Sequence, residues 1–324
     1  MANRLDGNTR DSHLMLCLEP CVFRNKNLIM KSLPTNIGSF SKSVQQLWEC
    51  MNPCILCPRK CKVHRSKGQI GFCGIADMPV VSSTGPHFGE ESVLVGAGGS
   101  GTIFFAGCNL GCIFCQNFDI SHYRHGRQVT IEKLAQSMLE LQNYGCSNIN
   151  FVTPTHVIPA ITAAVELAGK KGLTLPTVYN TGGYDSVETL KMLDGFIDIY
   201  MPDMKYSDSA VAQELSNAAD YPQVNREAVK EMHSQVGDLK IEKGLATRGL
   251  LVRHLVLPNK LAGSFKIIDF LAEQISPETA INVMDQYRPC YKASLHTPLN
   301  RRPTLEEIEA VKQYAIEKGL NLID

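Results

Sequence analysis

Three closely spaced cysteines are the residues of this chain best suited to redox chemistry. Cys108, Cys112 and Cys115 have the spacing C-x3-C-x2-C. Three thiolates from one short loop can bind three irons of a [4Fe–4S] cluster and leave the fourth iron open, as catalysis requires. Zinc would need a fourth ligand, and the nearest candidates, His122 and His125, are irregularly placed. The spacing therefore favours a catalytic iron–sulfur loop over a zinc loop or three buried structural thiols.

Four further cysteines form a second candidate metal site. Cys54, Cys57, Cys61 and Cys73 have the spacing C-x2-C-x3-C-x11-C, and Cys50 could substitute for one of them. Four thiolates fill the coordination of zinc or complete an auxiliary iron–sulfur cluster, and thiolate softness does not distinguish the two. The basic residues of the segment are Arg59, Lys60, Lys62, His64, Arg65 and Lys67. They would offset the thiolate charge, although such a run is also typical of a solvated face.

The composition agrees with metal binding. Eight of the twelve cysteines lie between residues 50 and 115 without a secretory signal core before them, which favours metal over disulfides. Basic and acidic residues both number 32, so the net charge of zero gives no general attraction to nucleic acid or an anionic membrane. No apolar run approaches the roughly 18–20 residues of a membrane span. We expect a cytoplasmic protein that binds neither nucleic acid nor a membrane. A targeting signal within residues 1–45 stays an alternative, because Met30 could be an internal start.

Alternating strands and helices must position these cysteines. From residue 102 onward, short apolar runs typical of parallel strands buried on both faces alternate with helical patterns. The predicted strands are Thr102–Ala106, Asn148–Val152, Thr177–Asn180, Ile197–Met201, Leu250–Val256 and Ala280–Met284. The predicted helices are Ile131–Tyr144, Val157–Lys170, Ser186–Leu193, Asp208–Ala219 with a further helix to Val236, Ser264–Ile275 and Thr304–Lys318.

This alternation predicts an α/β fold, a partial (β/α)6 barrel, over residues 102–324. Residues 46–101 form a Cys-rich metal-binding segment with connecting strands. Residues 1–45 show no firm period and are expected to be a poorly ordered extension.

The C-terminal ends of the predicted strands collect the remaining unusual polar residues, at the edge where sites form in barrels and open α/β sheets. These candidates are Thr153, Thr155, Asn180, Asp203, Lys205, Arg253 and Gln286. Alternation puts Asp203 and Lys205 on one side, and Arg253 within its apolar run needs a carboxylate partner. The alternatives are a surface ion pair for Asp203 with Lys205, an inward structural ion pair for Arg253, and an unliganded polar loop for Gln286.

The cysteine loop resembles that of the radical S-adenosylmethionine (SAM) superfamily. The resemblance lies in C-x3-C-x2-C after the first strand of a six-fold βα series, with the aromatic Phe114 before the third cysteine. It implies a [4Fe–4S] cluster whose open iron is chelated by the amino and carboxylate groups of SAM. An electron donor such as flavodoxin or ferredoxin would reduce the cluster. SAM would then yield a 5′-deoxyadenosyl radical that takes hydrogen from a substrate. Phe114 would pack near the adenine.

Further motifs look like one uncharacterised branch related to pyruvate formate-lyase activating enzymes. They occupy residues 54–61, 71–74, 115–117, 153–156 and 179–184, and the similarity covers roughly residues 50–320. The resemblance implies that Lys205 of an Asp-x-Lys element and Arg253 meet the cofactor carboxylate, while Asp203 orients the lysine or helps to bind a cation.

One motif departs from the family. Most members carry a Gly-Gly-Glu-type motif after the second strand, where this chain has Thr153-Pro154-Thr155-His156. The cofactor's amino end must therefore be held differently, and Thr153 and Thr155 are the candidates. Asn180 and Gln286 are further candidate cofactor contacts.

The leading functional hypothesis is an activating-enzyme-like protein that makes a carbon radical on a protein or peptide. The alternatives are a radical SAM enzyme acting on a small molecule and a non-catalytic iron–sulfur electron carrier. Cofactor-binding candidates gathered on one face argue against the carrier. An open barrel side would favour a macromolecular substrate, because a long segment must reach the cluster.

Overall fold

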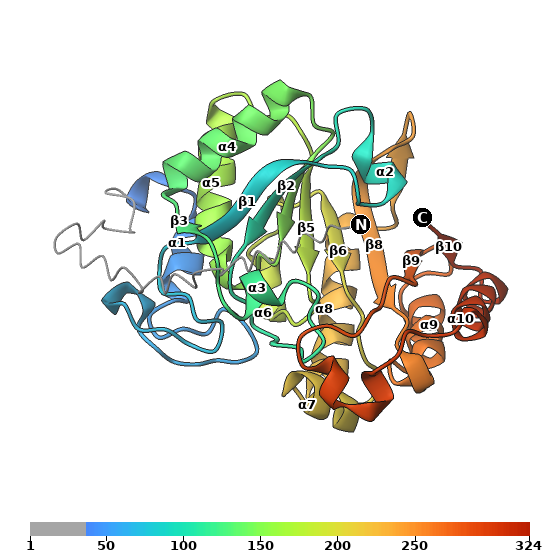
Figure 1. Ribbon diagram of the computed structural model, residues 1–324. Coiled ribbons are helices and arrows are strands. Elements are labelled where there is room, and N and C mark those ends of the chain that lie inside the picture. The colour runs from blue at the N-terminus through green and yellow to red at the C-terminus, as the bar shows by residue number, and fades with distance from the viewer. Residues whose placement is uncertain (1–36) are drawn as a thin grey trace, which may run out of the picture. The chain divides into compact units, whose positions relative to one another are not determined.

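The computed structural model describes residues 37–324, which belong to one compact unit (Figure 1). Residues 1–36 lie outside the described part of the chain, and so do Met30 and most of the predicted extension 1–45. None of the helices in the described residues is long and apolar enough to cross a membrane.

A ten-stranded sheet organises the unit, in the order β10-β9-β8-β6-β5-β4-β2-β1-β3, with β7 paired to β8. The parallel strands are β2 Ser100–Phe105, β4 Ile149–Val152, β5 Thr177–Thr181, β6 Ile199–Pro202, β8 Leu245–Leu255, β9 Ala280–Met284 and β10 Asn321–Leu322. The antiparallel strands are β1 Val80–His87, β3 Arg127–Gln128 and β7 Lys240–Glu242. All six predicted strands are confirmed, and so is the partial α/β barrel.

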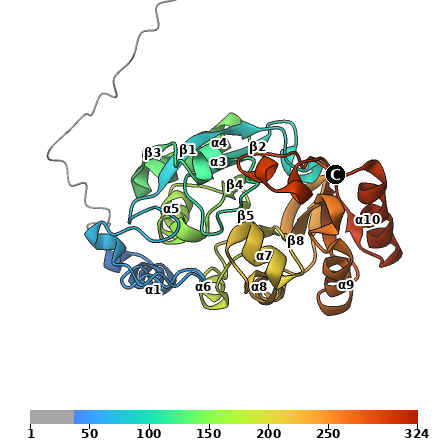
Figure 2. The same ribbon diagram turned by 60° about the horizontal axis from the view of Figure 1, so that its bottom comes forward.

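Helices connect successive parallel strands, and Figure 2 shows α5, α6, α8 and α9 following one another along the sheet. The helices are α1 Lys42–Glu49, α2 Ser92–Val95, α3 Phe118–Ser121, α4 Ile131–Tyr144, α5 Ile158–Lys170, α6 Val187–Lys191, α7 Ser209–Ser216, α8 Tyr221–Val236, α9 Ser264–Gln274 and α10 Leu305–Glu317. The 3-10 helices are η1 Ile37–Ser39, η2 Arg65–Lys67, η3 Thr155–Val157, η4 Pro258–Lys260, η5 Ala293–Leu295 and η6 Thr297–Leu299.

Local capping fixes the ends of the longer helices. Thr130 accepts a hydrogen bond from the backbone of Lys133 at the start of α4, and Gly145 ends that helix with φ of +96°. Thr304 and Glu307 form a reciprocal capping box at the start of α10. The Thr304–Glu307 capping box is visible in the sequence as the start of the predicted helix Thr304–Lys318.

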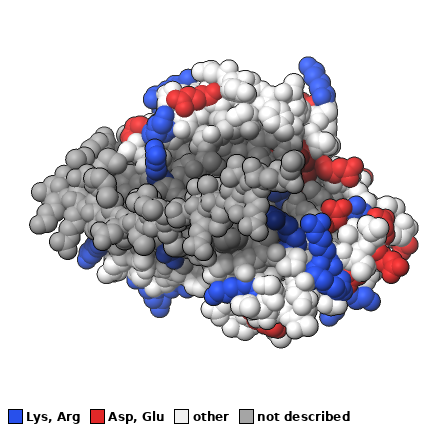
Figure 3. Space-filling view, viewed as in Figure 1, with Lys and Arg blue, Asp and Glu red and all other residues white. Residues whose placement is uncertain are grey.

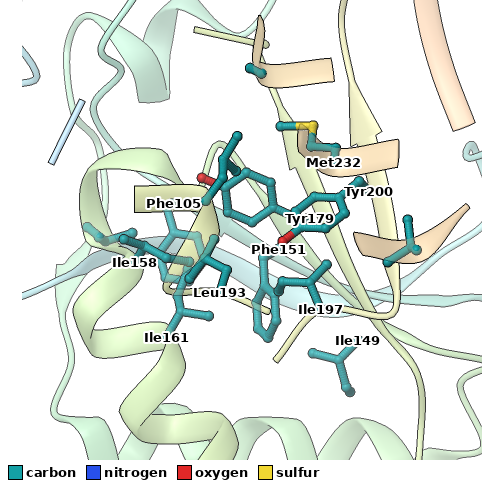
Figure 4. Close-up of a cluster of buried hydrophobic side chains, with 14 of the residues drawn as sticks. Phe105, Ile149, Phe151, Ile158, Ile161, Tyr179, Leu193, Ile197, Tyr200 and Met232 are labelled. Atoms are coloured by element: carbon teal, nitrogen blue, oxygen red, sulfur yellow. The ribbon is translucent and has the colours of Figure 1, made fainter. Parts of the chain in front are cut away.

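The main core lies between the sheet and helices α5, α6 and α8. Four neighbouring strands, β2, β4, β5 and β6, each contribute one large aromatic side chain that is at most 1% exposed. These aromatics are Phe105, Phe151, Tyr179 and Tyr200, and they lie with Ile158, Ile161 and Met232 of the helices (Figure 4). Full burial of a large apolar side chain contributes about 1.5–3 kcal/mol, so this layer holds the strands that carry the site.

Alternation along the strands separates this core from the opposite side of the sheet. Tyr179 belongs to the helix-side core, whereas Val178 and Leu251 belong to a different buried cluster. Side-chain alternation then puts Asn180 on the side of Val178 and Arg253 on the side of Leu251. Two of the candidate site residues therefore face away from the main core.

Residues 37–45 differ from the prediction of a poorly ordered extension. They form η1 and the first turn of α1, and Phe40, Val44, Leu47 and Trp48 are buried. The spacing of these four side chains follows one face of a helix, which anchors the segment on the core. Residues 37–45 thus belong to the folded unit.

Charged side chains are dispersed on the face seen in Figure 3. Lys and Arg stand in separate groups among uncharged atoms, and Asp and Glu gather toward the right of the view. The net charge of zero is consistent with this mixture.

Candidate functional site

The cysteine loop follows directly on β2, at the C-terminal edge of the parallel strands. Two glycines give it its path, with φ of +83° at Gly107 and +72° at Gly111. A Cβ on Gly107 would lie 2.6 Å from the carbonyl oxygen of Cys73, and one on Gly111 would lie 3.1 Å from the ring of Phe72. Glycine is needed here both for the left-handed backbone and for close approach to the Cys-rich segment.

The three thiols of the loop interact with one another. Burial and then the neighbouring Cys112 raise the pKa of Cys108 to about 12. The same two causes, burial and Cys112, raise the pKa of Cys115. Adjacent negative charges oppose each other, so bound iron would supply the positive charge that permits all three to ionise.

Each sulfur of the loop also has a hydrogen-bonding neighbour. The backbone N–H of Leu110 donates to Cys108 Sγ at 3.3 Å, and Ser216 Oγ donates to Cys112 Sγ at 3.0 Å. Ser121 Oγ lies 3.1 Å from Cys115 Sγ. Hydrogen bonds to cluster sulfurs orient the ligands and adjust the reduction potential. The donor set and its surroundings thus fit a [4Fe–4S] cluster.

The sequence reasoning missed both serines. Ser121 lies six residues after Cys115, so the motif's vicinity could have suggested it. Ser216 ends α7 and is 104 residues from Cys112 in the chain. No local pattern could have joined those two.

Arg59 of the Cys-rich segment also reaches the cysteine loop. Its guanidinium donates to the carbonyl oxygens of Asn109 at 2.9 Å, Leu110 at 3.1 Å, Ser216 at 3.0 Å and Asn217. It lies 3.9 Å from the ring centre of Phe72 and 5.2 Å from that of Tyr184. In the sequence, Arg59 stands out only as one charge in a basic run. In the structure it is one of the links between the cysteine loop and the end of α7.

Asp203 and Lys205 form an ion pair beside this loop. Lys205 Nζ lies 2.5 Å from Asp203 Oδ2, as expected for two residues on one side of a strand end. Burial lowers the pKa of Lys205, but Asp203 and then Cys112 raise it, and the net direction is upward. The lysine is therefore a retained cation within the electrostatic reach of the Cys112 thiol.

Arg253 already has carboxylate partners in the chain. Its guanidinium donates to both oxygens of Glu91 at 2.6 Å and to Glu90, and Asn282 donates to Glu91 at 2.8 Å. This is the inward ion pair that sequence analysis gave as the alternative. A role toward a cofactor carboxylate stays a prediction. His254 faces the other way, with its ring nitrogens 2.7 Å from Met204 O and 2.8 Å from Ser264 Oγ, as a satisfied core histidine.

Thr155 belongs to a buried network around Asp185. The hydroxyls of Thr155, Tyr179 and Thr181 donate to this carboxylate at 2.8, 2.9 and 2.7 Å. Burial raises the pKa of Asp185 despite these donors. The network ties together the ends of β4 and β5, so Thr155 contributes at least to the shape of this edge.

Thr153 and Asn180 also meet at this edge. The backbone N–H of Thr153 donates to Asn180 O at 2.9 Å, and Thr153 has φ of +60°. A left-handed backbone at a β-branched residue is unusual and is found where the surroundings determine it. Asn180 is 8% exposed. Both residues lie where the prediction placed them, and their roles toward a cofactor stay predictions.

Phe114 and Gln286 connect the cysteine loop to the segment after β9. Phe114 is buried and contacts Tyr206 and Tyr287 edge-on, with ring centres 6.3 and 6.0 Å apart. Gln286 is exposed, and its carbonyl accepts from Gln116 Nε2 at 3.0 Å. The structure thus brings the last predicted strand end to the first.

Two cavities bear on the location of chemistry. One of about 250 Å³ adjoins the cysteine loop and is lined by Cys108, Gly111, Ser121 and Tyr291, among others. A larger cavity of about 630 Å³ lies against the N-terminal ends of α9 and α10. None of the predicted site residues lines the larger cavity. The smaller cavity is therefore the better candidate for the active site.

The thiols of the second cysteine set influence one another electrostatically. Burial and then the thiols of Cys73, Cys54 and Cys61 raise the pKa of Cys57 to about 12, although a backbone hydrogen bond opposes the shift. No three His, Cys, Asp or Glu side chains in residues 37–324 are grouped so that they could hold a single metal ion.

Comparison with known proteins identifies the broad class. A family model described as "Radical SAM superfamily" matches residues 102–238, which include the cysteine loop. The chain is 34% identical to the uncharacterized protein MJ0674 of Methanocaldococcus jannaschii over 280 residues, which are 83% of this chain and 76% of the relative. Protein MJ0808 of the same organism is 24% identical over 298 residues, with coverage of 83% and 79%.

Solved structures show a weaker likeness. A radical SAM methyltransferase from Sphaerobacter thermophilus has 14% identity and a TM-score of 0.47, over 68% of this chain and 65% of that one. HydG, a maturase of the [FeFe]-hydrogenase, has the same identity and TM-score over 66% and 48%. Likenesses of this size do not identify a reaction.

Proposed function

The chain belongs to the radical SAM superfamily, and on this basis we propose that it is an activating-enzyme-like enzyme that takes a hydrogen atom from a protein or peptide. The observation that carries the proposal is the loop of Cys108, Cys112 and Cys115 at the C-terminal edge of the sheet, with Lys205 in electrostatic reach of Cys112. Cleavage of SAM by an electron from the cluster supplies the radical for this step.

The residues around the loop would divide the work of holding the cofactors. The three cysteines would ligate iron, and the hydroxyls of Ser121 and Ser216 would hold two of the thiolates. Lys205 would bind the SAM carboxylate through a charge-assisted contact while Asp203 holds its ammonium group. Phe114 would form an apolar wall near the adenine of SAM. The backbone at Thr153 would shape the part of the site that holds the amino group of SAM.

Arg253 can take part only together with its carboxylates. A SAM carboxylate arriving at this guanidinium would meet Glu90 and Glu91 as like charges. Lys205 is therefore the stronger candidate for that contact. Arg253 would act by keeping the segment before α2 in place.

The open sheet supports a macromolecular substrate. β3 and β10 stand at the two ends of the strand order and do not pair with each other, so the described strands do not close into a barrel. An open side gives an extended peptide segment room to approach the cysteine loop, whereas a closed barrel would admit small molecules more readily. A small-molecule substrate is the alternative.

Two assays test this function. After anaerobic reconstitution with iron and sulfide, the protein with SAM and a flavodoxin, a ferredoxin or dithionite as reductant should form 5′-deoxyadenosine. Cys108→Ala, Cys112→Ala and Cys115→Ala should each abolish this product. Cleavage at the wild-type rate in any of the three would exclude this loop as the site of cleavage, and the absence of cleavage by the reconstituted wild type would leave the electron-carrier alternative.

The class of substrate can be read from the transferred hydrogen. The enzyme would be incubated with a deuterated cell extract divided by dialysis into a macromolecular and a small-molecule fraction. Deuterium in 5′-deoxyadenosine only from the macromolecular fraction supports a protein or peptide substrate. Deuterium only from the small-molecule fraction would establish the alternative.

A further inference from the structure

Aromatic and basic side chains gather around the cavity of about 250 Å³ that adjoins the cysteine loop, and Cys108 lies in the wall of that cavity. Phe72, which also lines it, is 41% exposed, and the neighbouring Tyr123 is 57% exposed. Aromatic residues and arginine are the side chains most enriched where proteins bind one another. We call this set the rim, and it consists of Phe72, Tyr123, Arg124, Tyr291 and Lys292.

Stacked rings hold the rim in a defined arrangement. The ring of Tyr291 is stacked on that of His122 with 4.3 Å between centres and on that of Phe118 at 5.5 Å. Tyr123 contacts Phe118 edge-on at 5.6 Å. Tyr291 also has φ of +52°, which a bulky residue adopts only where the surroundings determine it. The segment after the cysteine loop and the segment after β9 therefore form one continuous surface.

The two cations of the rim are held by the fold but lack carboxylate partners. Arg124 has φ of +60°, and its guanidinium occupies the space that a Cβ on Gly74 would need. The N–H of Lys292 donates to Ile113 O at 2.9 Å, and its ammonium group lies 5.3 Å from the ring centre of Tyr291. No Asp or Glu among residues 37–324 forms an ion pair with either cation.

The charge around this cavity is positive. Arg124 and Lys292 line it, and its described lining contains neither Asp nor Glu. The cavities of about 630 and 450 Å³ differ, because each has glutamate as well as lysine in its lining. Asp119 of α3 is the acid nearest to Arg124 in the sequence, and it is exposed. In a chain with a net charge of zero, this local excess of positive charge favours the approach of an acidic partner.

We propose that the rim is the docking surface for an acidic electron-transfer protein, such as a flavodoxin, that reduces the cluster. The proposal rests on the radical SAM chemistry of the proposed function and is independent of the class of substrate. The step is the transfer of one electron, in which the donor protein is oxidised and the cluster bound to the three cysteines is reduced. Complexes of this kind have small, transient interfaces, which a few side chains around one cavity can provide.

The position of the cavity favours an electron donor over an acidic substrate. Cys108 lines the cavity, so a protein that covers the rim lies beside a ligand of the cluster. Lys205 and Asp203, which would hold SAM, do not line it. A donor at the rim would therefore leave the predicted SAM contacts accessible. A substrate must instead reach the carbon radical that SAM supplies.

The first experiment measures binding of a purified flavodoxin to the reconstituted protein by calorimetric titration. Arg124→Glu and Lys292→Glu should each raise the Kd about tenfold at low ionic strength, because each replaces an attraction by a repulsion. The effect should shrink at about 0.15 M salt. Lys240→Glu, at an exposed lysine of β7, makes the same change of charge and should leave the Kd unaltered.

A gain-of-charge variant guards against misfolding. Asp119→Lys should lower the Kd, a change that a folding defect cannot produce. An unchanged Kd in both Arg124→Glu and Lys292→Glu would overturn the proposal. An equal rise of the Kd in Lys240→Glu would overturn it too, since the attraction would then come from the charge of the whole chain.

The second experiment measures 5′-deoxyadenosine formed from SAM without added substrate. Each variant is driven by subsaturating reduced flavodoxin and, separately, by dithionite, a small reductant that needs no docking surface. The ratio of the flavodoxin-driven to the dithionite-driven rate should fall about tenfold in Arg124→Glu and in Lys292→Glu and stay constant in Lys240→Glu. An equal loss with both reductants would overturn the proposal, because the rim would then maintain the cluster and not bind the donor.

The two arms keep the failures apart. Absence of cleavage by the wild type with dithionite would contradict the proposed function, whereas the titration would still decide whether the rim binds flavodoxin. An unchanged ratio in both rim variants would overturn the docking surface while leaving the proposed function intact.

Discussion

Replacement of Arg59 by Met tests how the cysteine loop is held in place. The side chain makes four hydrogen bonds to carbonyl oxygens, two on the loop and two at the end of α7. Arg59→Met removes all four while keeping much of the apolar contact with Phe72 and Tyr184. The loop and α7 would then be joined by the hydrogen bond of Ser216 to Cys112 and by that of the Ile113 N–H to the carbonyl oxygen of Leu215.

The magnitude follows from these contacts. A hydrogen bond to a charged group contributes about 1.5–3 kcal/mol when considered alone. Arg59 is partly exposed, so solvent screens the charge and replaces some of the lost contacts. The contributions of the four hydrogen bonds are also not additive, because one side chain makes all of them. We therefore expect the free energy of unfolding to fall by about 2–4 kcal/mol in total.

Two measurements check the expectation. Anaerobic denaturant titration gives the free energy of unfolding, and iron analysis with a 5′-deoxyadenosine assay reports on the catalytic loop. Arg59→Lys should recover only part of both, because a single ammonium group cannot reach four carbonyl oxygens as a guanidinium does. Lys60→Met, at the exposed neighbouring residue, is the matched control and should change neither.

A free energy of unfolding of Arg59→Met within about 0.5 kcal/mol of the wild-type value would contradict this role of Arg59, because surface substitutions usually have effects of that size. Reduced stability with unchanged iron content and unchanged SAM cleavage would assign Arg59 a purely structural role. A joint loss of stability, iron and cleavage would establish it as a positioning residue for the loop.

Three further predictions follow from buried charges. Lys205→Ala should weaken SAM binding by about 1.5–3 kcal/mol in a calorimetric titration while sparing cluster iron, and unchanged affinity would leave the residue a strand-end ion pair. Arg253→Ala leaves Glu90 and Glu91 buried without their guanidinium partner, so the free energy of unfolding at neutral pH should drop by about 3–5 kcal/mol, and a smaller loss would indicate that water or their remaining neighbours, His87 and Asn282, compensate. Burial lowers the pKa of His254 to about 4 in the folded protein. Between about pH 6.5 and 4 the unfolded chain therefore binds a proton at this residue that the folded chain does not. The free energy of unfolding should fall as the pH drops through that window, by up to about 3 kcal/mol. His254→Asn should flatten this dependence, and an unaltered slope would contradict the assignment.

Some features of this protein follow from the sequence because they are short-range. The apolar runs of the six predicted strands and the capping signals at Thr130 and Thr304 lie within a few residues of the structure they determine. The same holds for the C-x3-C-x2-C loop after β2, whose ligands come from one short segment. Strand alternation also placed Asp203 and Lys205 together, as their ion pair shows.

Other features depended on contacts between distant parts of the chain. Arg253 needed a carboxylate, but its partner Glu91 lies 162 residues away. Ser216 and Cys112 are 104 residues apart, and Arg59 and Ser216 are 157 apart. The apolar residues within 40–48 have the spacing of one helix face. This pattern was not recognised from the sequence because the segment is short and polar residues surround it.

The physical reason for this division lies in the range of the interactions. Hydrophobic periodicity, turn formation and capping act between neighbours in the chain, so the sequence determines the elements and the edge where the cysteine loop must lie. Hydrogen bonds and ion pairs of buried groups act between neighbours in space, and many polar residues are chemically able to satisfy a given thiolate or guanidinium. Only the packing of the sheet and its helices selected Ser216 for Cys112 and Glu91 for Arg253.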